Sequence, residues 1–165
     1  NDYDLEGNTQ TINTTPIVQP LHGTVTINTD GTFTYDINGC YVGADSFVYQ
    51  ICDNGTPQAC DQATVYLLIQ DTTVPTITAQ AANQTIECDS TDTTSALNAW
   101  LASNGGATAT DACSTITWTN NFTGLSDGCG ATGTATVTFT ATDACGNAST
   151  SSASFRSEES RVRTV

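Results

Sequence analysis

The sequence contains no Lys, and its three Arg residues (Arg156, Arg161 and Arg163) all fall within the last ten positions. His22 is the only His, while all but two of the 17 acidic residues precede Arg156. Residues 1–155 are therefore purely acidic apart from His22, and we expect them to repel nucleic acid and anionic membranes, because proteins bind both through Lys and Arg. Their carboxylates must stay hydrated or bind cations, and hard oxygen ligands favour calcium. An acidic surface also keeps a long extracellular protein soluble.

Several motifs of enzymes and metal sites are absent as well. There is no GxSxG, HExxH or P-loop motif, and a lone His22 is a poor general base, so we expect no enzymatic activity. The seven Cys residues include no CxxC pair, which argues against a zinc or redox site and favours disulfides in an oxidising compartment. The longest apolar run, residues 63–69, is too short to cross a membrane. We therefore expect an exported polypeptide without direct membrane insertion.

The residues that are abundant, Thr, Ser, Asn, Ala and Gly, are typical of strands joined by turns. A hairpin is predicted around the turn at residues 29–31 (TDG), and a polar loop at residues 53–62. Residues 71–75 (DTTVP) are predicted to be a linker at a domain boundary. The β-like runs before that linker are residues 23–28, 32–36, 47–52 and 63–70.

The part after the linker has one helical pattern among β-like runs. Leu97, Trp100 and Leu101 have i, i+3, i+4 spacing within residues 95–103, and the following Asn-Gly-Gly provides a helix stop. Trp100 and Trp118 are expected in the core. The β-like runs are residues 76–88, 115–122, 134–142 and 148–155.

The hexapeptide TATDAC occurs twice, at residues 108–113 and 140–145. Each copy ends a β-like segment with an Asp and a Cys two residues apart. We interpret the copies as two similar loops at one end of a β-sandwich.

Residues 1–70 resemble the cadherin-like tandem repeat of large bacterial surface proteins. The resemblance rests on NDYDLEGNTQTI, HGTVTINTDGTFTYD and GADSFVYQICDNG, and is most specific at residues 1–2, 22–24, 31–35 and 45–49. It implies a cadherin-like β-sandwich over residues 1–70. One or two strands normally precede the NDxD opening in this family, so the resemblance implies that this sandwich lacks its first strand or strands.

Residues 71–155, from DTTVPTIT to TATDACGNAS, resemble HYR-like immunoglobulin-type repeats. Together the two resemblances imply an all-β fold of two tandem sandwiches, the second with one short helix. The implied function is a structural stalk module of a bacterial cell-surface or secreted adhesin, as in gliding-associated surface proteins. Its partners would be neighbouring repeats of the same long chain. The basic tail, residues 156–165, departs from the pattern and is left outside the predicted fold.

A binding module of an exported protein, recognising a surface glycan or protein, is the alternative function. Exposed aromatic side chains on one face would favour it, and burial of all of them would count against it. The candidates are Tyr35, Tyr41, Tyr49 and Trp118.

The Cys residues suggest a set of disulfides. Cys52 and Cys60 bracket a predicted hairpin loop and are expected to pair across it. Cys40 then stays free, pairs with a part of the domain outside this chain, or replaces Cys52 as the partner of Cys60. In the second domain, the loop arrangement of an immunoglobulin-like sandwich implies two further disulfides, Cys88–Cys129 and Cys113–Cys145.

Two groups of acidic residues are candidate calcium sites. In the first group, residues with oxygen ligands alternate with other residues before Gly7, as in one half of an EF-hand calcium loop. The distal Glu of such a loop is missing, so a hydrated acidic turn is the alternative. The first group consists of Asp2, Asp4 and Glu6.

The second group lies where the implied sandwich meets the linker, and consists of Asp71, Asp111 and Asp143. Either a cation offsets the repulsion among these carboxylates, or each Asp caps its own turn. The repeat type also implies O-glycosylation at an Asp followed by Ser or Thr and a small residue. The acceptors would be Thr72, Ser90 and Thr93.

Overall fold

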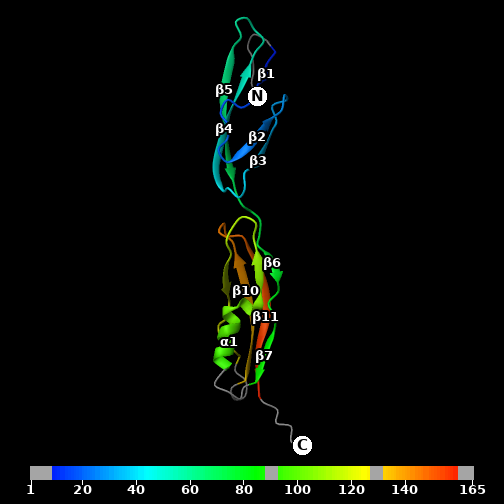
Figure 1. Ribbon diagram of the computed structural model, residues 1–165, viewed down its shortest axis with the longest axis vertical. Helices are drawn as coiled ribbons and strands as arrows, with labels where there is room; N and C mark the ends of the chain where they lie inside the picture. Colours follow the sequence, from blue (N-terminus) through cyan, green and yellow to red (C-terminus); the bar gives the residue numbers. More distant parts are fainter. Residues whose placement is uncertain (1–8, 88–92, 127–131, 160–165) are drawn as a thin grey trace, which may run out of the picture. The chain divides into compact units, whose positions relative to one another are not determined.

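The structure is a computed structural model in which residues 9–87, 93–126 and 132–159 are described. The chain divides into two compact units, Asn1–Asp71 and Thr72–Val165. Strands are the main regular structure in the described part of each unit, and the second unit adds an α-helix, α1 (Figure 1). The chain is therefore mostly β, as the sequence predicts.

The first unit packs two antiparallel sheets against each other. One sheet has the strand order β1-β4-β5, and the other is the β2–β3 hairpin (Figure 1). Val25 and Ile27 from the hairpin meet Phe47 from β4 in a core that solvent hardly reaches. The strands are β1 (Thr11–Ile12), β2 (Gly23–Ile27), β3 (Phe33–Ile37), β4 (Gly43–Cys52) and β5 (Cys60–Ile69).

Both hairpins lie where the sequence predicts strands, but the β4–β5 hairpin is longer than expected. β4 begins at Gly43 and β5 at Cys60, so the two strands pair from Gly43–Ile69 to Cys52–Cys60. The loop between them is correspondingly shorter than the predicted residues 53–62. Its closure has a local cause, because Asp53 Oδ1 accepts hydrogen bonds from the backbone N of Gly55 (3.1 Å) and of Ala59 (2.8 Å).

The second unit also contains two sheets. The larger has the order β7-β11-β10-β9, with β7 parallel to β11 and the other pairs antiparallel, and the smaller is β6-β8. Its strands are β6 (Thr76–Ala79), β7 (Gln84–Glu87), β8 (Thr108–Thr110), β9 (Thr117–Asn120), β10 (Gly133–Thr142) and β11 (Ala148–Glu158). Its helices are α1 (Thr93–Ala102) and a short 3₁₀ turn at Asn104–Gly106.

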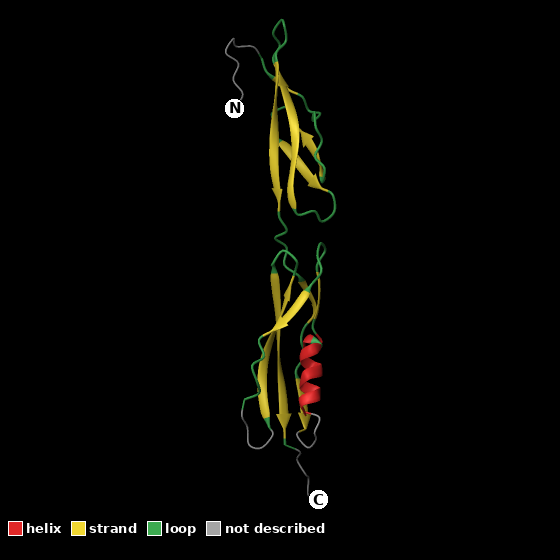
Figure 2. Ribbon diagram, turned by 90° about the vertical axis from the view of Figure 1, so that its left-hand side faces the viewer, coloured by secondary structure: helices red, strands yellow, loops and turns green. Residues whose placement is uncertain are grey.

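The helix α1 provides part of the core of the second unit. Leu97 and Trp100 pack with Val137, Phe139 and Phe155 from the larger sheet, and Figure 2 shows the helix alongside these strands. Trp100 is 5% exposed, and its indole N–H donates a hydrogen bond to the carbonyl of residue 82 (3.0 Å). The predicted helix and the core position of Trp100 are thus confirmed.

The predicted single strand at residues 76–88 is wrong, since β6 and β7 belong to different sheets. Polar contacts hold the segment between them against β11. Ser151 Oγ donates to Gln80 Oε1 (2.7 Å) and accepts from the backbone N of Ala81 (2.7 Å), and Asn83 Oδ1 accepts from the backbone N of Ser154 (2.8 Å). These partners lie about seventy residues away in sequence, so no local pattern marks the break.

The last strand extends beyond the predicted limit at residue 155. β11 continues to Glu158, with Arg156 exposed, Ser157 2% exposed, and Arg156 Nε 3.0 Å from Glu158 Oε1. Residues 156–158 of the tail therefore belong to the sheet, because the alternation of inward and outward side chains continues through the charged residues. Residues 160–165 lie outside the described part of the chain.

Candidate functional site

Asp143 directly follows β10 and is 5% exposed. Its Oδ1 accepts hydrogen bonds from the backbone N of Cys145 (2.9 Å) and Asn147 (2.8 Å), and its Oδ2 accepts one from Asn147 Nδ2 (2.8 Å). Burial alone would raise the pKa of this carboxyl group, but the hydrogen bonds outweigh burial and lower the pKa. Asp143 is therefore a carboxylate at neutral pH although it is largely withdrawn from water.

Asp111, in the first TATDAC copy, forms the equivalent turn after β8. Its Oδ1 accepts hydrogen bonds from the backbone N of Cys113 (2.8 Å) and Ser114 (2.9 Å). The two copies are adjacent, because the backbone N of Ala144 donates to Ser114 Oγ (3.3 Å). Asp111 Oδ2, in contrast, is buried with no hydrogen-bond partner among the described residues. An orphaned, buried carboxylate oxygen is costly unless a cation or water satisfies it.

Asp71, at the start of the linker, completes a group of three acids. One carboxylate oxygen from each of Asp71, Asp111 and Asp143 lies within 4.8 Å of the other two. Asp143 is buried and the other two are half-buried, so solvent only partly screens their repulsion. Carboxylate oxygens at this separation match the ligand type and crowding of a calcium site. The sequence analysis leaves cation binding and turn capping as alternatives. In the structure Asp111 and Asp143 both cap turns through their Oδ1 atoms, and Asp111 Oδ2 has no hydrogen-bond partner among the described residues.

The remaining candidate metal and glycan residues are distributed differently. Asp2, Asp4, Glu6 and Ser90 lie outside the described residues. Thr72 is exposed in the linker. Thr93 is the first residue of α1, and its hydroxyl oxygen is buried, so it is a poor acceptor for a bulky glycan in the folded state.

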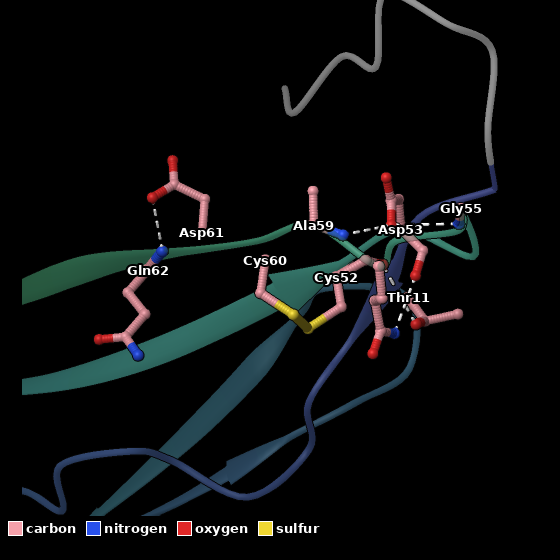
Figure 3. Close-up of a disulfide and its surroundings, with 9 residues drawn as sticks. Thr11, Cys52, Asp53, Gly55, Ala59, Cys60, Asp61 and Gln62 are labelled. Carbon is pink, nitrogen blue, oxygen red and sulfur yellow. Dashed lines mark hydrogen bonds between the residues drawn. A yellow bond between two sulfur atoms is a disulfide. The ribbon is translucent and has the colours of Figure 1, made fainter.

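Cys52 and Cys60 form a disulfide across the last residue pair of the β4–β5 hairpin (Figure 3). The cross-link lies beside the loop that Asp53 closes, so a covalent bond and a hydrogen-bonded cap act at the same end of the hairpin. Thr11 Oγ1 also donates to the carbonyl of Cys52 (3.3 Å), which attaches β1 to this end. Cys40 is disulfide-bonded too and, with Cys52 and Cys60 joined, it does not replace Cys52.

The predicted Cys113–Cys145 disulfide is wrong. Cys113 is disulfide-bonded, whereas Cys145 is an exposed free thiol. The two Cys residues do lie in adjacent loops, but a disulfide also requires suitable Cα separation and side-chain direction, which shared loop position does not ensure. The predicted partners Cys88 and Cys129 lie outside the described residues.

The sequence motif around Asp45 has a structural role that the residue pattern alone did not reveal. Asp45, at 7% exposure, accepts hydrogen bonds from the Tyr35 hydroxyl (2.7 Å) and from three backbone amides, those of residues 21 (3.0 Å), 22 (2.9 Å) and 46 (2.8 Å). Burial alone would raise the pKa of Asp45, but these donors outweigh it and hold that pKa well below its usual range. Burial, with the adjacent carboxylate, raises the pKa of Tyr35 to about 12.

The four aromatic side chains proposed as a binding face are all half-buried. Tyr35 is held by Asp45, and Tyr41 stacks on His22 with ring centroids 3.5 Å apart. Tyr49 and Trp118 pack against the cores of the first and second units respectively. Their structural contacts count against a glycan-binding platform built from these residues.

Comparison with known proteins bears mainly on the first unit. Residues 1–71 match the model of the bacterial cadherin-like domain, so this part of the chain is similar to a cadherin-like repeat. No curated protein matches the sequence. In the described part of the chain, no helix has the length and hydropathy of a membrane span.

Among solved structures, the chain is similar to mouse cadherin-23 EC22–24, with 17% identity and a TM-score of 0.37, over 94% of this chain and 56% of that one. It is also similar to protocadherin gamma B7 extracellular cadherin domains 1–4, with 12% identity and a TM-score of 0.35, over 92% of this chain and 42% of that one. The chain thus spans between two fifths and three fifths of these proteins' lengths.

Proposed function

We propose that the chain is a structural stalk module of a bacterial cell-surface or secreted adhesin, with no catalytic role. The observation that carries this proposal is the match of residues 1–71 to the bacterial cadherin-like domain. In the proposal, residues 71–155 are an HYR-like immunoglobulin-type domain, and neighbouring repeats of the same long chain are the partners. The module acts through length and stiffness, which the cross-linked hairpin and the closed loops support.

Calcium is the proposed stiffening ion, and Asp71, Asp111 and Asp143 are its proposed ligands. Three features favour this assignment: the oxygen ligands, a buried Asp111 Oδ2 that has no hydrogen-bond partner in the described part of the chain, and the lack of Lys and Arg in residues 1–155. A divalent cation there would offset the repulsion among the three carboxylates and fix the linker residue Asp71 to the two TATDAC loops. Each oxygen would supply charge and coordination rather than any reaction chemistry.

The test is thermal unfolding under non-reducing conditions, first with calcium and then with excess chelator. Trp fluorescence is the signal that monitors unfolding. Both Trp residues lie within Thr72–Val165, the unit that contains Asp111 and Asp143. Calcium at about a hundred times its Kd should stabilise this unit by about 2.7 kcal/mol. A chelator should reverse the gain.

The matched variants are Asp111→Asn and Asp36→Asn. Asp111→Asn retains an Oδ1 acceptor for the turn but removes the charge, so the calcium response should disappear while the fold persists. Asp36→Asn removes one charge at an exposed position outside the group and should leave the calcium response unchanged. Equal melting temperatures with calcium and chelator would show that these acids serve the turns and the solubility of the chain alone.

A further inference from the structure

Three Asn residues of this chain are each followed by Gly, in the dipeptides at residues 38–39, 54–55 and 104–105. In such a dipeptide the backbone N of Gly can attack the side-chain amide carbon of the preceding Asn, because Gly has no Cβ to obstruct the approach. The attack expels ammonia and begins the conversion of Asn to an acidic residue. Since the reacting residues are the same at all three places, their surroundings in the fold decide which one reacts fastest.

The loop between β4 and β5 places a carboxylate beside the attacking nitrogen of the second dipeptide. The backbone N of Gly55 donates a hydrogen bond to Asp53 Oδ1 (3.1 Å), which Figure 3 shows. Asp53 is only 9% exposed, and the Cys52–Cys60 disulfide closes the hairpin beside it, so its carboxylate is held in position. A carboxylate that is hydrogen-bonded to the attacking N–H is placed to act as a general base.

The same loop also has a hydrogen-bond donor on the amide that is attacked. Asn54 Oδ1 accepts a hydrogen bond from the backbone N of Thr9 (3.0 Å). Negative charge develops on this oxygen when the nitrogen attacks, and a donor that already points at it stabilises the charge. Asn54 is exposed and Gly55 is half-buried, so water has access to the product. The loop therefore combines a base, an oxyanion donor and access for water around one dipeptide.

The other two dipeptides have different surroundings. Within the described residues, neither the Asn38 side chain nor the Gly39 backbone N makes a hydrogen bond, so Asn38 has neither a base nor a donor. Asn104 precedes the buried Gly105, where an added Cβ would meet Phe139 at 3.0 Å. Ring closure at Asn104 needs backbone movement that this packing against the core opposes. Asn38 is therefore an internal reference without assistance, and Asn104 is a protected one.

We propose that Asn54 is a site of self-catalysed deamidation, with Asp53 as the base and the Thr9 amide as the oxyanion donor. The Gly55 nitrogen attacks Cγ of Asn54 while its proton passes to Asp53. The bond between Cγ and Nδ2 then breaks, and ammonia leaves with that proton. Water opens the resulting succinimide at either carbonyl, so the products are Asp and isoAsp. This modification site adds a negative charge to the β4–β5 loop and depends on neither calcium nor the stalk function.

The experiment incubates the folded 165-residue chain at neutral pH in water enriched in heavy oxygen. Each deamidation incorporates this oxygen, which distinguishes it from amide loss during sample handling. Pepsin digestion in acid releases the three peptides, since residues 1–155 offer trypsin no Lys or Arg, and mass spectrometry gives the rate at each Asn. A positioned base commonly contributes roughly 10²–10⁴-fold. Asn54 should therefore react at least about tenfold faster than Asn38, and Asn104 should react most slowly.

Two controls test the roles of the fold and of Asp53. In the reduced chain unfolded in denaturant, the three sites should react at similar rates, because only the fold distinguishes them. Asp53→Asn retains an Oδ1 acceptor for the loop but removes the base, so the rate at Asn54 should fall toward that at Asn38. In the wild type, the rate at Asn54 should rise less steeply with pH than that at Asn38, since only Asn38 relies on hydroxide. Asp53→Asn should remove this difference in slope.

A second variant keeps the test decisive if Asp53→Asn unfolds the first unit, which Tyr fluorescence melts would reveal. Thr9→Pro removes the N–H that points at Asn54 Oδ1 and leaves the Asp53 hydrogen bonds in place. It should slow the reaction at Asn54 and leave the rate at Asn38 unchanged. The proposal would be overturned if Asn54 reacted no faster than Asn38 in the folded chain, or if neither variant slowed it.

Discussion

The Cys52–Cys60 disulfide is the cross-link whose effect on stability follows most directly from the structure. Its two Cys residues are separated by 8 positions in the sequence. In the chain-entropy model, cross-linking a loop of this size lowers the entropy of the unfolded chain and so raises its free energy by about 2.5 kcal/mol. Replacing both residues with Ser should lower the free energy of unfolding of the first unit by about that amount. Its Tm should fall by about 10–20 °C, since small domains lose roughly 4–8 °C per kcal/mol.

The aromatic residues allow the two units to be followed separately in one sample. All five Tyr residues lie within Asn1–Asp71 and both Trp residues within Thr72–Val165. Tyr emission therefore reports unfolding of the first unit, and selectively excited Trp emission reports the second. In the double variant we expect the Tyr transition to move down and the Trp transition to stay. Cys145→Ser, which removes an exposed free thiol, is the matched control and should move neither.

Two results would refute this reasoning in different ways. An unchanged Tyr transition would mean that the long strand pairing and the Asp53 cap already hold the hairpin end, so the cross-link adds nothing. An equal downward shift of both transitions would mean that the two units unfold as one cooperative body rather than as independent domains.

Two further predictions concern single residues. Asp45→Asn should lower the Tm of the first unit more than Tyr35→Phe, because Tyr35→Phe removes only one of the hydrogen-bond donors to Asp45. Since the pKa of Asp45 is depressed in the folded state, the stability that its carboxylate contributes is complete above about pH 4 and is lost as the pH falls through the folded pKa. In thermal melts, the advantage of the wild type over Asp45→Asn should therefore shrink toward pH 2. Gly105 and Gly106 both have positive φ (65° and 83°), but only a Cβ on Gly105 would approach Phe139 (3.0 Å). In denaturant unfolding, Gly106→Ala should lower the free energy of unfolding by about 1–2 kcal/mol, and Gly105→Ala should lower it clearly more. Equal losses in the two variants would disprove the close-packing argument.

The sequence predicts the elements of this fold well where the signal is local. The alternation of residues in the two hairpins and the spacing of Leu97, Trp100 and Leu101 depend on neighbours within one strand or helix, and the strands and helix lie where these patterns indicate. The break between β6 and β7 depends on Ser151 and Ser154, which are distant in sequence, so a continuous β-like run gave no sign of it.

The candidate site was predictable in part for a related reason. The repeated TATDAC indicates equivalent turns, and the structure places Asp111 and Asp143 in such turns with adjacent loops. The repeat carries no information on side-chain direction, however. Cys145 is exposed in its turn, so the disulfide that the immunoglobulin-like loop arrangement implied is wrong although the two loops are adjacent.

The cadherin-like motif in the first unit can be explained by one set of contacts. The HG segment supplies the His22 amide to Asp45, the GTFTY segment supplies the Tyr35 hydroxyl, and the GxDSF segment supplies Asp45 itself. Gly23 is needed there because a Cβ would overlap the Tyr35 ring. Every group in this set is consumed by the fold, so the motif specifies how three strands are held and no ligand. A better candidate for ligand chemistry is a group without a hydrogen-bond partner among the described residues, Asp111 Oδ2 beside its two acidic neighbours.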